Sequence, residues 1–329
     1  MGDSVLTQPA LRRLGRSELM VTPVGLGCWQ FSRSKGLGKY WPSLDEATVD
    51  AVVASALDGG INWFDTAESY GRGESEKTLS RTLQKAGRRP GEVIIASKWF
   101  PLFRTAANIG KTIPVRIAAL SPYPIDLYQV HHPTSLSSNT EVMKAMAALV
   151  KAGKAKHVGV SNFGASRMRE AHKTLREEGL DLISNQVHYS LLKRSAERNG
   201  VMDAARELGI SIIAYSPLDQ GILTGRFHDN PEAVKAVSGP RKYRGFFRKA
   251  FLVRSRGVIE ALKEIAARRA ATPAQVALSW LFSFHGETVV VIPGATRATQ
   301  AAANAASMGI ALSKDELDHL DRVSRPFMD

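Results

Sequence analysis

Short apolar runs alternate with longer segments of helical periodicity along most of the chain. Apolar and β-branched runs bounded by polar or glycine-rich turns predict buried strands. They occur at 24–29, 61–64, 93–97, 125–130, 157–162, 182–188, 210–216 and 288–292. Helices are predicted around 44–58, 74–85, 114–120, 139–151, 165–178, 195–208, 258–269, 273–284 and 297–307. A short hairpin over 11–21 is expected to precede the first strand.

The order of these elements favours one architecture. Continuously apolar strands that alternate with helices are typical of a parallel sheet covered on both faces. Eight such units in 329 residues predict an α/β fold, a closed (β/α)8 barrel of the TIM-barrel type. We therefore expect a single barrel domain over residues 1–329, with an N-terminal β-hairpin and an insertion between strands seven and eight.

Three titratable residues stand directly after three successive predicted strands. Asp65, Lys98 and His131 follow one another at intervals of 33 residues, which is the length of one strand, one helix and two loops. Active sites of this barrel lie at the carboxyl ends of the strands. Each residue alone has an ordinary structural explanation, as a loop cap, a solvent-facing lysine or a packed histidine. Their occurrence together, beside Tyr70 on the loop after Asp65, predicts an active site.

These four residue types suit proton transfer to a carbonyl oxygen. A tyrosine hydroxyl has a pKa of about 10, and a nearby lysine ammonium is expected to lower that pKa. Asp65 would keep the ammonium of Lys98 charged, and His131 would polarise a substrate oxygen. No side chain supplies a hydride, so reduction of a carbonyl group requires a nicotinamide cofactor.

Several segments together resemble the aldo-keto reductase superfamily. They are FDTAESYG at 64–71, ASK at 96–98, DLYQVH at 126–131, VGVSNF at 158–163, NQ at 185–186, AYSPL at 214–218 and IPG at 292–294. The resemblance runs from about Leu11 to Met308. It implies an NADPH-dependent reductase of small aldehydes or ketones, with Tyr70 as proton donor and Asp65, Lys98 and His131 completing a tetrad.

The resemblance also implies contacts to the cofactor and the substrate. The nicotinamide end is matched by Ser161, Asn162, Gln186 and the stacking ring of Tyr215. The diphosphate is matched by Ser216, Pro217, Leu218, Asp219, Gln220, Gly221 and Arg226, and the adenosine end by Gly294, Thr296, Arg297, Gln300 and Asn304. Gly27 and Trp29 complete the implied cofactor set, while Trp29, Trp99 and His132 match the lining of the substrate pocket.

The adenosine end favours NADPH, with NADH as the alternative. Arg297 matches the position that contacts a 2′-phosphate, and the positive net charge acts in the same direction. Many relatives carry a glutamate that contacts the adenine directly before the position of Asn304. This chain has Ala303 there, which predicts fewer adenine contacts.

Two other patterns superficially resemble a dinucleotide-binding fingerprint and a metal site, and we expect neither to be one. Gly25-Leu-Gly27 lacks the third glycine of a dinucleotide-binding fingerprint, so a Rossmann interpretation fails. His131 and His132 are adjacent on a predicted strand and should point to opposite faces, so no metal site is predicted.

Composition and charge narrow the expected location and partners. The chain has one cysteine, Cys28, no apolar run long enough to span a membrane and no signal-peptide pattern, which favours a cytoplasmic protein. Its net charge is +13 at pH 7. Nucleic acid is nevertheless not an expected partner, because no recognised binding module or aromatic stacking pattern accompanies the charge.

Much of this charge lies in one stretch near the carboxyl end. Between Glu232 and Glu260 the chain has no acidic residue and eight basic ones, which are Lys235, Arg241, Lys242, Arg244, Arg248, Lys249, Arg254 and Arg256. The stretch falls in the insertion, in the region where this fold commonly binds phosphate. It is interpreted either as a solvated surface or as a lid that orders over NADPH. The loop at 32–41 is similarly either a pocket flap or ordinary packing.

A nucleotide-sensing regulatory subunit is the alternative to an enzyme. The potassium-channel β-subunits of the same superfamily belong to this class, and they typically carry Asn at the position of His131. The complete tetrad therefore favours the enzyme.

Overall fold

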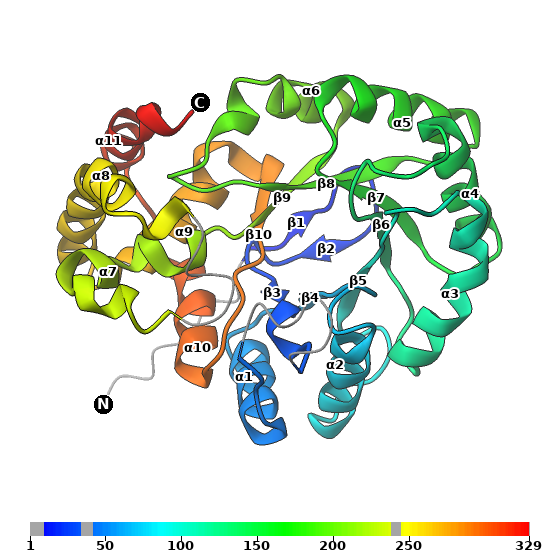
Figure 1. Ribbon diagram of the computed structural model, residues 1–329, viewed down its shortest axis with the longest axis horizontal. Helices are drawn as coiled ribbons and strands as arrows, with labels where there is room; N and C mark the ends of the chain where they lie inside the picture. The colour runs from blue at the N-terminus through cyan, green and yellow to red at the C-terminus, as the bar shows by residue number, and fades with distance from the viewer. Residues whose placement is uncertain (1–9, 34–41, 238–244, 329) are drawn as a thin grey trace.

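The computed structural model describes residues 10–33, 42–237 and 245–328. Eight parallel strands form one sheet in the order β10-β9-β8-β7-β6-β5-β4-β3. They are β3 (Leu26–Gly27), β4 (Trp63–Asp65), β5 (Ile94–Trp99), β6 (Leu127–Val130), β7 (His157–Ser161), β8 (Leu182–His188), β9 (Ser211–Tyr215) and β10 (Val289–Val291). Parallel bridges join Val24 to Val291 and Gly27 to Gly294, so the first and last strands meet and the sheet closes. The predicted (β/α)8 barrel is confirmed (Figure 1).

Helices surround the barrel as an outer ring (Figure 1). They are α1 (Glu46–Asp58), α2 (Glu74–Lys85), α3 (Ala107–Leu120), α4 (Asn139–Lys151), α5 (Ala165–Glu177), α6 (Val201–Leu208), α7 (Arg226–Asp229), α8 (Lys249–Arg268), α9 (Pro273–Phe284), α10 (Ala298–Ala306) and α11 (Lys314–Ser324). Ser138, Thr272 and Ser313 begin three of them with reciprocal capping boxes, which satisfy the free amide groups of the first turn. In the described part of the chain, no helix is long and apolar enough to cross a membrane.

Several predicted boundaries are wrong. Helix α3 begins at Ala107, well before Pro114, and α8 begins at Lys249, so it includes part of the basic stretch. The segment predicted as one helix over 195–208 is divided, because Gly200 adopts a left-handed φ of 79° between a 3-10 turn and α6. Strand β3 is shorter than predicted, and α11 was not predicted at all.

The predicted N-terminal hairpin closes the amino-terminal end of the barrel. It consists of β1 (Arg12–Arg13) and β2 (Met20–Val21), and Leu14 in its turn packs against the barrel interior. The backbone N–H of Gly15 donates to Ser211 Oγ at 2.8 Å. A side chain at Gly15 would collide with the carbonyl of Ile183, which lies 2.4 Å from the position of a Cβ. Among the described residues, the hairpin thus covers the amino-terminal end of the barrel, opposite the end where the predicted site residues lie.

Two predicted mobile elements fall partly outside the described residues. Most of the proposed flap at 32–41 lies there, as do Arg241, Lys242 and Arg244 of the basic stretch. Described residues of that stretch include Lys235 before the gap and Arg254 and Arg256 on α8.

Candidate active site

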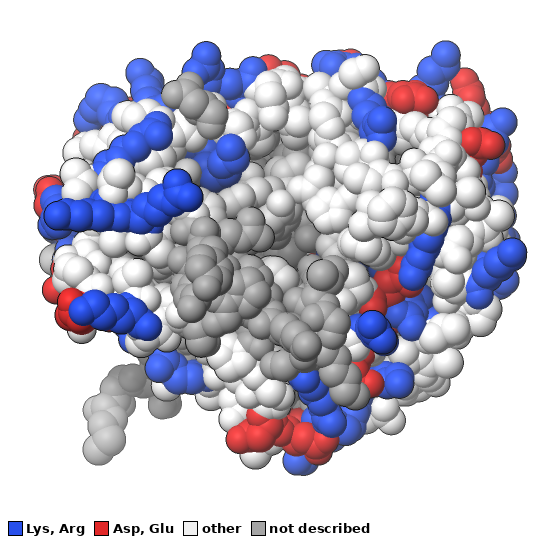
Figure 2. All heavy atoms as spheres, viewed as in Figure 1, with Lys and Arg blue, Asp and Glu red and all other residues white. Residues whose placement is uncertain are grey.

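The carboxyl ends of the strands open into a pocket of about 1100 Å³. Figure 2 shows a hollow near the centre of this face, with basic side chains placed mainly around the periphery. The loops that follow β3, β4, β5, β6, β7, β9 and β10 all contribute to the pocket wall, and β8 contributes Gln186 and its last residue, His188. Most of the predicted site residues therefore lie around one continuous cavity.

Lys98 lies at the centre of the tetrad and has no exposed surface. Its Nζ donates to Asp65 Oδ1, to the carbonyl oxygen of Thr66 at 2.8 Å and to Tyr70 Oη at 3.3 Å. Asp65 ends β4 and pairs in register with Ala96 on β5, two residues before Lys98. Strand pairing thus brings the carboxylate to the ammonium, and the loop after β4 brings Tyr70 to the same ammonium.

The second oxygen of Asp65 is bound by two glutamines. Gln129 Nε2 donates to Oδ2 at 3.1 Å, and Gln186 Nε2 donates to it at 2.8 Å. All three side chains are buried, and a buried carboxylate needs such donors to remain charged. Gln129 was not among the predicted site residues, although a glutamine in the apolar run of β6 is a detectable sequence signal.

The pKa shifts in the tetrad follow from burial and the charge of Lys98. Burial alone would lower the pKa of Lys98, but the nearby Asp65 and Tyr70 raise it above its ordinary value. Burial raises the pKa of the Tyr70 hydroxyl, and the attraction of Lys98 offsets only part of that rise. The expected net lowering is therefore wrong for this structure. Burial, with the charge of Lys98, holds the pKa of His131 well below its ordinary range, so its imidazole is neutral.

His131 and His132 point into the same pocket, contrary to prediction. Strand β6 ends at Val130, so the alternation of side chains along a strand does not extend to these two residues. Their rings stack with centroids 4.9 Å apart and planes at 5°, and Phe100 meets both rings edge-on. Across the described ranges, no three His, Cys, Asp or Glu side chains are grouped to hold a metal.

The residues predicted to hold a nicotinamide amide form a hydrogen-bonded group. Asn162 Nδ2 donates to His132 Nδ1 at 3.1 Å, and Asn162 Oδ1 accepts from Tyr215 Oη at 2.9 Å. Ser161 Oγ donates to the carbonyl oxygen of Gln186 at 2.9 Å. These contacts tie the ends of β7, β8 and β9 to the substrate side of the pocket.

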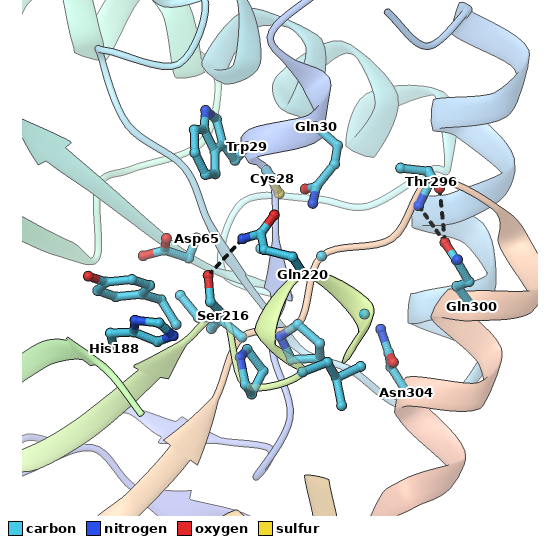
Figure 3. Close-up of a pocket in the computed structure, with 18 of the residues that line it drawn as sticks. Cys28, Trp29, Gln30, Asp65, His188, Ser216, Gln220, Thr296, Gln300 and Asn304 are labelled. Carbon is cyan, nitrogen blue, oxygen red and sulfur yellow. Dashed lines mark hydrogen bonds between the residues drawn. The ribbon is translucent and has the colours of Figure 1, made fainter. Parts of the chain in front are cut away.

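The other predicted cofactor positions continue along the same wall (Figure 3). Those that line it are Gly27, Trp29, Ser216, Pro217, Leu218, Gln220, Gly221, Arg226, Gly294, Thr296, Arg297, Gln300 and Asn304. Gln300 Oε1 accepts from the backbone N–H and the hydroxyl of Thr296, at 2.9 and 3.0 Å. Asn304 Nδ2 and Gln30 Oε1 are buried in this wall without a hydrogen-bond partner among the described residues, which fits a polar ligand.

Three predicted site residues do not line the pocket. Lys98 is fully buried and contacts Asp65 and Tyr70, which do line it. Trp99 is fully buried, and its indole N–H donates to Asn108 Oδ1 at 3.0 Å, outside the barrel. The next residue, Phe100, directly follows the end of β5 and takes its place in the wall. Asp219 is also fully buried, and its carboxylate contacts His188 and Ser190.

Sequence reasoning missed other residues of the wall. Gln30 lines the pocket directly after the predicted Trp29. His188 also lines it and is the last residue of β8, a strand-end position like that of His131 after β6. The position of a polar residue at a strand end was the available signal for His188. Phe246 also lines the pocket, and only the three-dimensional path of the insertion brings it there.

Comparison with known proteins identifies the family. A profile of the aldo/keto reductase family matches residues 23–325. The chain belongs to this family. An uncharacterized oxidoreductase of Mycobacterium tuberculosis is 37% identical over 310 residues, which are 93% of this chain and 90% of that protein. A chloroplastic pyridoxal reductase of Arabidopsis thaliana is 32% identical over 320 residues, covering 93% and 84% of the two chains.

A solved structure agrees with this assignment. The crystal structure of a thermostable aldo-keto reductase with the inhibitor epalrestat has a TM-score of 0.75 and 25% identity to this aldo-keto reductase. The similarity covers 95% of this chain and 99% of the other. The predicted family and enzyme class are confirmed: the protein is a carbonyl-reducing enzyme that depends on NAD(P)H.

Proposed function

We propose that this aldo-keto reductase uses NADPH to reduce aldehydes or ketones to alcohols, and that Tyr70 protonates the carbonyl oxygen. One observation carries the proposal. The buried ammonium of Lys98 donates to Tyr70 Oη at 3.3 Å and also to Asp65, which keeps it charged. A cation beside a hydroxyl stabilises the phenolate that remains after proton donation.

The protonation states of the side chains suit these roles. Because burial raises the pKa of Tyr70, its hydroxyl holds its proton at neutral pH and is available as an acid. His131 is neutral, and Ser69 Oγ lies 3.3 Å from its Nδ1. The imidazole therefore orients or polarises a carbonyl oxygen by hydrogen bonding and adds no competing cation beside Lys98.

The proposed cofactor site combines the nicotinamide, diphosphate and adenosine positions. Bound NADPH would supply the hydride to the carbonyl carbon. Asn162 and Gln186 would hold its amide, and Tyr215 would stack on the ring. Arg297, exposed at the N-terminus of α10, would bind the 2′-phosphate with the help of the helix dipole. This arrangement supports NADPH over NADH.

The substrate side supports small, planar carbonyl compounds. Trp29 stacks on Tyr70 with ring centroids 5.8 Å apart, and the His131–His132 pair and Phe100 enclose the same space. Aromatic side chains provide apolar contact area at little entropic cost. Pyridoxal and aromatic aldehydes are therefore candidate substrates, together with methylglyoxal and simple ketones.

NADPH oxidation measured across this panel tests the proposal. We expect turnover with at least one aldehyde, and less than one-tenth of that rate when NADH replaces NADPH, an estimate of about tenfold from one lost charge-assisted contact. Binding of NADPH without oxidation by any carbonyl would contradict the proposal and favour a nucleotide-sensing subunit.

A further inference from the structure

The buried carboxylate of Asp219 connects a pocket loop to the end of a barrel strand. His188 Nε2 lies 2.8 Å from Oδ1, and Ser190 Oγ donates to Oδ2. Asp219 has no exposed surface, whereas His188 lines the pocket. Both oxygens are thus occupied by groups at or just after the end of β8, and neither is directed at a ligand in the pocket.

The loop that carries Asp219 has an unusual backbone. Residues 216–221, here called the β9 loop, include three non-glycine residues with left-handed φ: Ser216 at 50°, Asp219 at 44° and Gln220 at 58°. Such conformations are strained, and they persist where the surrounding structure holds them. Within the loop, the N–H of Asp219 donates to the carbonyl oxygen of Ser216 and the N–H of Gly221 to that of Leu218, each at 2.9 Å, and Gln220 Nε2 donates to Ser216 Oγ at 3.4 Å.

His188 also contacts the aromatic ring next to this loop. Its imidazole stacks on Tyr215, with centroids 5.4 Å apart and planes at 18°, and Phe246 meets its edge. Figure 3 shows His188, Ser216 and Gln220 in the pocket wall, with Gln220 hydrogen-bonded to Ser216 within the β9 loop. One histidine therefore supports both the ring proposed to stack on the nicotinamide and the anchor of the strained loop.

We propose that His188 and Asp219 form a clamp that holds the β9 loop in its strained, ligand-binding conformation and thereby sets how long the cofactor stays bound. Asp219 is a positioning residue in this view and makes no contact with the cofactor. With an ionised carboxylate, His188 Nε2 carries the hydrogen that joins the two. The inference rests on the proposed cofactor site, and it assigns a role to two residues outside the tetrad.

Asp219→Ala removes the clamp. In stopped-flow fluorescence with NADPH alone, we expect the rate constant of NADPH dissociation to rise about tenfold. The reason is that a relaxed loop is no longer preorganised in the conformation that binds the cofactor. The rate constant of hydride transfer in a single turnover at saturating NADPH should stay within about threefold, because the tetrad is untouched. A dissociation rate within about twofold of wild type would overturn the proposal.

Asp229→Asn is the matched control. This exposed residue lies on α7 and pairs with Lys263, so the variant loses a comparable negative charge without touching the clamp. It should leave NADPH dissociation unchanged. If Asp229→Asn accelerates NADPH dissociation as much as Asp219→Ala does, the acceleration is caused by the loss of a negative charge in general, and the proposed clamp is wrong.

Two histidine variants separate anchoring from packing. His188→Gln keeps an amide donor for Asp219 and should restore most of the slow dissociation, whereas His188→Leu should not. The double variant Asp219→Ala/His188→Leu should dissociate NADPH no faster than about the faster single variant, because both changes remove one contact. Effects that multiply would show that the residues act independently and would overturn the clamp.

Hydrogen exchange in the cofactor-free protein tests the loop itself. The amides of Asp219 and Gly221 should exchange at least about tenfold faster in Asp219→Ala than in wild type. This result does not depend on NADPH, so a protein that fails to bind NADPH would refute the proposed function and leave the clamp testable. Unchanged exchange would refute the clamp alone. If Asp219→Ala does not fold, Asp219→Asn decides, with an expected increase of about threefold.

Discussion

The proposed catalytic end and the proposed diphosphate end of the pocket are held by different kinds of structure. Asp65 and Lys98 lie on neighbouring strands whose register brings them together, and both side chains are buried, although Asp65 still lines the pocket. The β9 loop leaves its strand at Tyr215 and depends on contacts from the end of β8. Strand pairing determines the first arrangement, and distant side chains determine the second.

The two ends also differ in electrostatics. At the catalytic end, one ammonium is matched by one carboxylate in the interior. At the cofactor end, Arg226 and Arg297 are exposed at the rim. Removal of a group from the buried end should therefore affect chemistry and folding, whereas removal of a rim arginine should affect mainly ligand affinity.

The largest expected effect is at the catalytic end. Tyr70→Phe removes the proposed acid and should lower kcat by about 100- to 10,000-fold, which is the usual contribution of a positioned proton donor. The NADPH dissociation constant should change less than about twofold, because the hydroxyl acts on the substrate. Steady-state turnover and fluorescence titration measure the two quantities. Near-normal turnover would rule out Tyr70 as the acid.

A second effect concerns the stability of the folded protein, which should depend on the protonation of the buried Glu76 near the tetrad. Glu76 accepts from Ser97 Oγ at 2.6 Å and pairs with Arg116 at 2.9 Å, and burial raises its pKa from 4.5 to about 7. The folded state therefore binds this proton more tightly than the unfolded chain, and stability falls as pH rises from about 4.5 through about 7. The difference corresponds to about 3 kcal/mol of the free energy of unfolding, at about 1.4 kcal/mol per pKa unit.

Urea unfolding at about pH 5 and about pH 8 measures this loss. In Glu76→Gln, which cannot titrate, the loss between the two pH values should be smaller by most of that amount. An equal loss in both proteins would mean that another group causes it.

A third effect separates the ends of the cofactor. Arg297→Ala should raise the dissociation constant for NADPH by about 10- to 100-fold, the value of a lost charge-assisted contact, and leave NADH nearly unchanged. Arg226→Ala is the comparison. Because both cofactors carry the diphosphate, loss of a residue beside it should weaken the binding of NADPH and NADH equally. If Arg297→Ala weakens both cofactors equally, Arg297 does not contact the 2′-phosphate.

The smallest expected effect is the titration of one tyrosine. In the cofactor-free protein, Tyr70 should ionise above its ordinary pKa of 10, because burial outweighs the attraction of Lys98. The difference in ultraviolet absorbance between wild type and Tyr70→Phe isolates this titration. Ionisation below about pH 9 would show that the ammonium dominates after all.

The sequence by itself determined the barrel and the grouping of Asp65, Tyr70, Lys98 and His131 at one end of it. Each strand is encoded by a local apolar run, and equal spacing places Asp65, Lys98 and His131 at the ends of neighbouring strands. Local signals also determined helices such as Asn139–Lys151, which begins at a capping box. These features depend on residues close together in the chain.

Tertiary structure alone decided where several side chains point. His131 and His132 share a pocket because β6 ends before them, and Trp99 turns away while Phe100 turns in. The carboxylate of Asp219 is buried away from the pocket because it binds His188 and Ser190, which lie about 30 residues earlier in the chain. Burial likewise decided the sign of the pKa shift of Tyr70. Contacts and solvation of this kind arise only when distant segments pack together, so no local pattern records them.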